Sequence, residues 1–286
     1  MWQGLAETIA DANLMQSAGM TFARFDFSWA NSEVTRGSYL YFDKLDAVLD
    51  VLAARGISSA ITVIETPGWA NGGAGNFAPP TNPADYANFI GLLARHNAAR
   101  PGMTWEIWNE PNDVHFWTTG PNPAGYAALL KGAYAAVKAN DPDATVLGGS
   151  IVFNDTAFLE GLYANGAGSS FDGLSIHPYC GAHAPADLSE SWFTFAGSVP
   201  QFSQILAGHA QAGKPIWITE MGWSTGDVSD AVRAIYLRDA MVIVRGWSQV
   251  RSMAAYTIHQ TQFGAYGLLT PANAPTLSWT AYAAAQ

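Results

Sequence analysis

Two glutamates, Glu110 and Glu220, each end an apolar stretch that contains tryptophan. Glu110 lies in the segment TWEIWNEPN, where Pro111 follows it directly. Proline lacks a backbone donor and pushes the residue before it towards an extended conformation, so we expect Glu110 to keep strand geometry at the rim of a sheet. Glu220 ends the segment PIWITE in the same manner. Both carboxylates are therefore expected where strands end.

Two carboxylates that face one another are the groups that glycoside hydrolysis requires. One protonates the departing oxygen, and the other attacks the anomeric carbon or activates a water molecule. A single glutamate at a strand end is more often part of a salt bridge at the rim. Two such residues, each close to tryptophan, favour a catalytic pair.

The elements that must hold these glutamates alternate regularly along the chain. Apolar runs of strand length cover 21–29, 57–64, 104–110, 145–153, 171–179, 215–223 and 250–258. Segments with helical periodicity cover 4–20, 41–56, 83–97, 123–140, 156–166, 199–213, 229–247 and 276–285. This alternation predicts parallel pairing, and at this length it favours one α/β domain over 1–286, a (β/α)8 TIM barrel. An open doubly wound sheet is the structural alternative, although no G-x-G-x-x-G loop follows any of these strands.

The strand count is one short of a closed barrel. Seven strands are found, and the residues before Thr21 are predicted to form a helix that ends at Gly19. The first strand is therefore expected to be missing or truncated, with MWQ (1–3) as the tail of a strand that upstream residues would complete. Alternatively, another chain or an irregular segment fills the gap left by the missing strand. With this count, Glu110 and Glu220 end the fourth and seventh strands, which face each other across the mouth of a barrel.

The composition excludes several classes of partner. The net charge is −10, with 13 Lys+Arg against 23 Asp+Glu, so nucleic acid and anionic membranes are not expected to bind. No apolar run reaches membrane-spanning length. The expected ligand is neutral. The protein is expected to be a monomer or weak oligomer. A secretory signal is not found in this chain, and the compartment stays open, with secretion as one option.

Metal and cofactor chemistry are not expected either. The single cysteine, Cys180, excludes an internal disulfide and a Cys-based zinc site. The six histidines form no H-x-H and no H-E-x-x-H pair, which disfavours a metal-dependent barrel hydrolase; they are His96, His115, His177, His183, His209 and His259.

Together, WEIWNEPN and IWITEMGWS resemble clan A of the retaining glycoside hydrolases. The segments RFDFSW, FAPPTNPADYANF, ATVLGGS, DGLSIHPY and GLLTPANAPTLSWTAYAA resemble the family 39 and family 5 barrels in the same order. The resemblance implies hydrolysis of a neutral oligo- or polysaccharide by double displacement, with Glu110 as the acid/base and Glu220 as the nucleophile. A transglycosidase and a catalytically weak carbohydrate-binding barrel remain alternatives.

The same resemblance suggests roles for four more polar residues. Arg24 resembles the arginine that keeps the nucleophile ionised, although an ion pair with Glu106 would also explain it. Asn109 resembles the residue that binds the sugar 2-hydroxyl. His177 and Tyr179 look like the sixth-strand pair of the clan, with Tyr179 within reach of the nucleophile; a satisfied core histidine is the alternative for His177.

Aromatic residues near strand ends are candidates for sugar stacking. Trp69, Trp117, Trp223 and Tyr256 follow or end strands, and each could equally belong to the core. Trp223 is favoured because it follows Glu220 closely. We place His259 and Gln260 at the end of the last strand, where many members of the clan carry a tryptophan.

Overall fold

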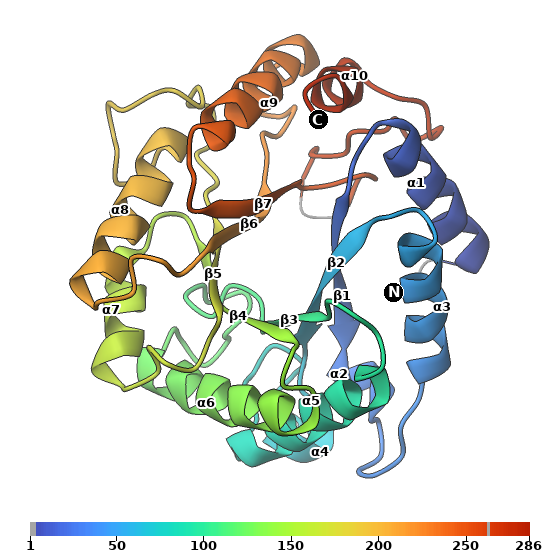
Figure 1. Ribbon diagram of the computed structural model, residues 1–286, viewed down its shortest axis with the longest axis vertical. Helices are drawn as coiled ribbons and strands as arrows, with labels where there is room; N and C mark the ends of the chain where they lie inside the picture. Colours follow the sequence, from blue (N-terminus) through green and yellow to red (C-terminus); the bar gives the residue numbers. More distant parts are fainter. Residues whose placement is uncertain (1–3, 262–263) are drawn as a thin grey trace.

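A curled parallel sheet forms the centre of the protein, and helices cover its outside (Figure 1). The computed structural model describes residues 4–261 and 264–286. Its seven strands follow one another in chain order. They are β1 (Phe22–Ser28), β2 (Ser58–Ile64), β3 (Thr104–Ile107), β4 (Thr145–Val152), β5 (Gly173–His177), β6 (Ile216–Met221) and β7 (Val250–Ala255). A doubly wound sheet would reverse its strand order at a switch point, so that alternative is wrong.

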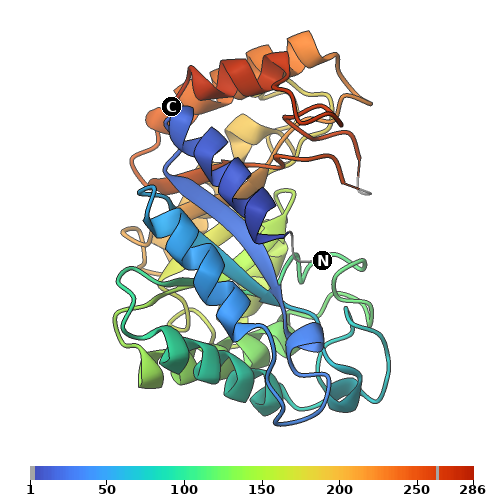
Figure 2. The same cartoon turned by 90° about the vertical axis from the view of Figure 1, so that its right-hand side faces the viewer.

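Helices separate the strands, as the alternation predicted. The long ones are α1 (Leu5–Ser17), α3 (Phe42–Ala53), α5 (Pro83–Asn97), α6 (Pro123–Asn140), α7 (Thr156–Ala164), α8 (Phe195–Gly208), α9 (Asp230–Arg245) and α10 (Leu277–Ala283). Two short helices, α2 (Trp29–Ser32) and α4 (Gly68–Asn71), were not predicted. In Figures 1 and 2, α1 packs beside α3 and α10 packs beside α9. No helix in the described ranges is long and apolar enough to cross a bilayer.

Local sequence explains why the best-predicted helices begin where they do. Asn82 and Asn122 cap α5 and α6, because their side chains accept hydrogen bonds from the backbone N–H groups of Ala84 and Gly125. Proline occupies the first position of both helices, where its missing N–H costs nothing. These two helices pack tightly against each other on the outside of the sheet.

A large cavity lies between the two edges of the sheet. β1 pairs with β2, β7 pairs with β6, and no pairing joins β1 to β7 within the described residues. The cavity has a volume of about 870 Å³ and is lined by α1, β1, β7 and α10 as well as by Arg24 and Glu220. The expected shortage of one strand therefore holds for the described residues, whereas MWQ (1–3) lies outside them.

Two strands, β3 and β7, end three residues earlier than predicted. β3 stops at Ile107 because Trp108 and Glu110 adopt left-handed backbone angles, with φ of 68° and 43°. The prediction that Glu110 keeps strand geometry is therefore wrong; a following proline disfavours the right-handed helical region but does not require an extended one. β7 stops at Ala255, so Tyr256, rather than His259 or Gln260, comes directly after the last strand.

Candidate active site

A backbone turn after β3 brings Glu110 to the mouth of the curled sheet. The left-handed conformations of Trp108 and Glu110 are costly for non-glycine residues, typically about 1–3 kcal/mol each. Trp108 packs into the core against Tyr86 and Trp117, and its indole N–H donates to the carbonyl of Phe116 over 2.7 Å. With Trp108 anchored in this way, Asn109 and Glu110 make hydrogen bonds to residues of other strands, Asn109 to Arg24 of β1 and Glu110 to His177 of β5.

Glu220 reaches the same mouth from β6. The register between β6 and β7 shifts between Ile218 and Met221, so the simple alternation of side chains breaks at this point. One carboxylate oxygen of Glu220 accepts from Arg24 Nη1 over 2.5 Å, and the other accepts from the Tyr179 hydroxyl over 2.7 Å. Both oxygens of Glu220 are thus held by hydrogen-bond donors, one of them the guanidinium of Arg24.

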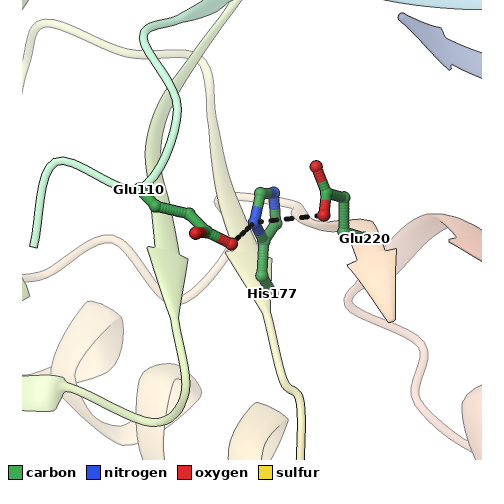
Figure 3. Close-up of side chains that lie close together, drawn as sticks. All are labelled: Glu110, His177 and Glu220. Carbon is green, nitrogen blue, oxygen red and sulfur yellow. Dashed lines mark hydrogen bonds and ion pairs between the residues drawn. The ribbon is translucent and has the colours of Figure 1, made fainter. Parts of the chain in front are cut away.

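The two carboxylates approach each other closely, with His177 between them (Figure 3). One oxygen of each glutamate and one ring nitrogen of His177 all lie within 4.8 Å of one another. An inverting glycosidase needs carboxyl groups about 6.5–9.5 Å apart to admit water, whereas a retaining enzyme holds them at about 5–5.5 Å. The separation of Glu110 and Glu220 matches the retaining geometry.

His177 connects Glu110 to a buried polar cluster. Its Nδ1 lies 2.8 Å from Glu110 Oε1, and its Nε2 lies 3.0 Å from the hydroxyl of Thr219 and 3.2 Å from that of Ser150. Burial raises the pKa of Glu110, His177 opposes the rise, and the negative charge of Glu220 adds to it, so the net pKa is raised. The pKa of His177 is also raised, because attraction to Glu220 and Glu110 outweighs the opposing effect of burial. The pair therefore retains a shared proton to higher pH than either group would alone.

Arg24 binds four acceptors from the middle of β1. Besides Glu220, it donates to Glu106 Oε2 over 2.9 Å and to Asn109 Oδ1 over 2.6 Å, and it lies 3.2 Å from Asp26. Both sequence interpretations of Arg24 are thus found together, the ion pair with Glu106 and the contact with the expected nucleophile. Burial raises the pKa of Glu106, but Arg24 and the other donors lower it further, and the net pKa is below its usual value.

The four aromatic residues predicted to stack on a sugar lie in different environments. Trp117 and Trp223 are each only 2% exposed, which favours the core alternative for both. Trp69 is half-buried, and the guanidinium of Arg36 covers its ring at 4.7 Å. Tyr256 lines the cavity and packs edge-on against Tyr179, with their ring centroids 6.4 Å apart. Of the four, only Tyr256 lines the cavity that Glu220 also lines.

Several residues of the site were missed or undervalued in the sequence. Thr219 precedes Glu220, and its hydroxyl donates to Glu106 over 2.7 Å. Ser150 lies within the register shift of β4, between Gly149 and Ile151, and its hydroxyl is 3.2 Å from His177 Nε2. Tyr266, far from any strand, packs against both Tyr179 and Tyr256. Thr219 lies two residues after Trp217 on β6, so the two side chains share a face, and this was a usable signal. Nothing in the local sequence indicates Ser150 or Tyr266.

One group of described residues has the spacing of metal ligands. It consists of Glu110, His177 and Glu220. Both oxygens of Glu220 already accept from Arg24 and Tyr179, and a divalent cation here would lie next to the guanidinium of Arg24. These donors suit a carboxylate that carries negative charge better than one shared with a metal ion.

Comparisons with known proteins agree with this geometry. The family model described as Cellulase (glycosyl hydrolase family 5) matches residues 2–263. A β-xylosidase of Caldicellulosiruptor saccharolyticus is 28% identical over 169 residues, covering 54% of this chain and 33% of its own length. A β-xylosidase of Geobacillus stearothermophilus is 36% identical over 83 residues, 27% of this chain and 16% of the relative. The chain thus spans about a third or less of these relatives.

Solved structures share the fold at low sequence identity. A family 39 glycoside hydrolase from Bacteroides cellulosilyticus WH2 aligns with a TM-score of 0.82 and 24% identity over 99% of this chain and 60% of its own. A GH5_18 protein of Streptomyces cattleya in complex with GlcNAc aligns with a TM-score of 0.74 and 15% identity, over 99% and 74%. At these identities the likeness establishes the TIM-barrel type of fold. Since the family model covers almost the entire chain, the protein belongs to glycosyl hydrolase family 5.

Proposed function

We propose that the protein is a retaining glycosidase that cleaves O-glycosidic bonds of a neutral oligo- or polysaccharide. The observation that carries the proposal is the close approach of Glu110 and Glu220, within 4.8 Å, in two different environments. Burial and the charge of Glu220 raise the pKa of Glu110, as a proton donor requires. Glu220 accepts from Arg24 and Tyr179, as an anionic nucleophile requires.

The first half of the reaction forms a glycosyl ester. A Glu220 oxygen attacks the anomeric carbon while Glu110 gives its proton to the glycosidic oxygen, and the bond between that carbon and the oxygen breaks. The negative charge of Glu220 is consumed as the ester forms. Asn109, held by Arg24 through its Oδ1, keeps its amide N–H groups free to donate to the sugar 2-hydroxyl.

The second half releases the sugar. Glu110, now a carboxylate, takes a proton from a water molecule, and the water oxygen attacks the anomeric carbon as the bond to Glu220 breaks. Two inversions at the same carbon give net retention. If another sugar hydroxyl replaces water in this step, the same residues perform transglycosylation.

The charge of the chain and the known relatives support the proposed substrate class. The acidic chain, with a net charge of −10, and four carboxylates around the cavity favour a neutral sugar over a uronic acid; these carboxylates are Asp11, Asp26, Glu65 and Glu220. The two curated relatives named above are β-xylosidases, and one structural neighbour holds GlcNAc. We further propose one catalytic domain that is a monomer or weak oligomer; a solved β-xylosidase from Caulobacter crescentus is monomeric. Neither nucleic acid nor a membrane surface is proposed as a partner.

Covalent trapping tests this function. The protein would be screened with 4-nitrophenyl β-glycosides of xylose, glucose, mannose and GlcNAc. The 2,4-dinitrophenyl 2-deoxy-2-fluoro analogue of the best non-acetamido substrate would then be added, because fluorine at C2 slows breakdown of the intermediate. Intact mass should increase by one fluoroglycosyl group, and peptide mapping should place it on Glu220. An adduct on another residue, or a hydrolysed substrate with no adduct and no time-dependent inactivation, would contradict the proposal.

A further inference from the structure

His177 has two possible neutral forms, and its surroundings distinguish between them. Its Nδ1 faces Glu110 and its Nε2 faces Thr219, so the form that is present decides whether a donor or an acceptor faces the carboxylate. The residue is fully buried, and water is not at hand to supply a substitute partner. The position of the proton therefore follows from the hydrogen-bonding capacity of the neighbours.

The hydroxyl proton of Thr219 is already used in a hydrogen bond to Glu106. Thr219 donates to Glu106 Oε1 over 2.7 Å, and Glu106 is a fully buried carboxylate whose other oxygen accepts from Arg24 and Thr62. A carboxylate can only accept, so the Thr219 proton points at Glu106 and the Thr219 oxygen is left as an acceptor. That acceptor lies 3.0 Å from His177 Nε2, which must carry a proton to bond to it.

We propose that Thr219, oriented by Glu106, locks His177 in the form protonated on Nε2 and so helps Glu110 to retain its acidic proton. In the locked form, Nδ1 is a bare acceptor 2.8 Å from Glu110. It bonds well to protonated Glu110 and is repelled by the carboxylate. Loss of the last proton from the pair is thereby disfavoured, and Thr219 acts as a positioning residue for the acid/base.

The other form would have the opposite effect. If the Nε2 proton moved to Nδ1, the ring would donate to ionised Glu110 and stabilise it. The bare Nε2 would then face the Thr219 oxygen, and two acceptors in contact repel each other. Ser150 is the second neighbour of Nε2, and its hydroxyl can act as donor or acceptor. Other charged or titratable groups around the pair are Glu220, whose Oε2 lies 4.0 Å from Nδ1, Arg24, Glu106 and Tyr179. None of these four has a hydrogen bond to Nε2, and Ser150 can adapt to either form, so Thr219, whose oxygen can only accept, decides the form.

The proposal rests on the glycosidase function, but its first test does not. Long-range ¹H–¹⁵N NMR on histidine-labelled protein reports which ring nitrogen carries the proton, and His177→Gln assigns the signal. The wild type should show His177 protonated on Nε2 throughout the range in which the ring is neutral. A neutral ring protonated on Nδ1 would overturn the proposal, whether or not the protein hydrolyses any glycoside.

Three variants test the consequence for the acid. Thr219→Val keeps the shape but removes the hydroxyl, Thr219→Ser restores the hydroxyl, and Thr62→Val removes a different donor to Glu106 that does not touch His177. For Thr219→Val, the basic limb of the kcat/KM profile on the best aryl glycoside should move to lower pH by about one unit, because Nδ1–H can now stabilise ionised Glu110. Thr219→Ser should keep the wild-type limb.

The control separates the lock from a general loss of packing. Thr62→Val should lower stability as Thr219→Val does but leave the basic limb within about 0.3 units of the wild type, well below the spread of about one unit among pKa values in folded proteins. An equal shift in both variants, or no shift in Thr219→Val, would overturn the proposal. If Thr219→Val does not fold, the wild-type NMR spectrum and Thr219→Ala decide in the same way.

Discussion

Replacing Arg24 with methionine should destabilise the protein strongly. The guanidinium lies between the fully buried Glu106 and Glu220, and its side chain is only 8% exposed. Breaking a buried ion pair by removing one partner typically costs about 3–5 kcal/mol, because the remaining charge is left without compensation. Glu106 keeps two hydroxyl donors, from Thr62 and Thr219, so we expect the lower end, about 3 kcal/mol at pH 7.5.

The loss should depend on pH with a definite sign. In the wild type the net pKa of Glu106 is below its unfolded value, so the ion pair stabilises the folded state above that value and the benefit disappears as pH falls through the folded pKa. Without Arg24, burial dominates and the pKa of Glu106 rises above its unfolded value. The variant then gains stability relative to the wild type as pH falls, and the difference between them should shrink between pH 7.5 and about pH 5.

Urea denaturation at both pH values measures the difference in free energy of unfolding. Arg36→Met is the matched control, because Arg36 pairs with Asp85 at the surface with its own side chain 65% exposed, and such a pair contributes within about 1 kcal/mol. A loss for Arg24→Met no larger than that of Arg36→Met would refute the argument. So would a loss that is the same at pH 7.5 and pH 5.

Three further predictions concern the catalytic cavity. Glu110→Ala should lower kcat/KM by roughly 10²–10⁴-fold for alkyl glycosides, whose leaving groups need a proton, and should spare 2,4-dinitrophenyl glycosides. Added azide should restore turnover. An equal loss for both leaving groups would exclude Glu110 as the acid. Tyr256→Ala should raise KM by roughly 5- to 10-fold, as expected for one lost aromatic contact, whereas Tyr256→Phe should not; an unchanged KM in Tyr256→Ala would remove Tyr256 from the sugar site. Dialysis against EDTA should leave activity unchanged, since Arg24 and Tyr179 already bind Glu220; a loss reversed by adding a divalent metal would contradict this.

The sequence predicted the fold well where local signals are strong. The bounds of α5 and α6 follow from Asn–Pro capping and agree with the predicted 83–97 and 123–140. The strands were placed correctly to within a few residues at each end, because long apolar runs between capped helices leave few alternatives. β3 was predicted too long because the left-handed backbone at Trp108 and Glu110 depends on tertiary contacts of the indole ring.

Alternation of side chains along the strands predicted much of the site. The prediction failed where a register shift interrupts that alternation. Arg24 and Glu106 lie on the inner side of the sheet, as alternation required, and they meet. Trp223 was favoured for its proximity in sequence to Glu220, which says nothing about direction after a register shift; its ring packs against Phe195 and Tyr236. The link from Glu106 through Thr219 to His177 joins three strands and leaves no pattern in any one of them.

The most direct test of the central proposal is the configuration of the first sugar released. ¹H NMR would follow hydrolysis of the best aryl glycoside in the first minutes, before mutarotation equilibrates the anomers. Because oxygens of Glu110 and Glu220 lie within 4.8 Å, the account predicts that the initial product has the same anomeric configuration as the substrate. An initial product of inverted configuration would contradict it, since Glu220 could not then be a covalent nucleophile.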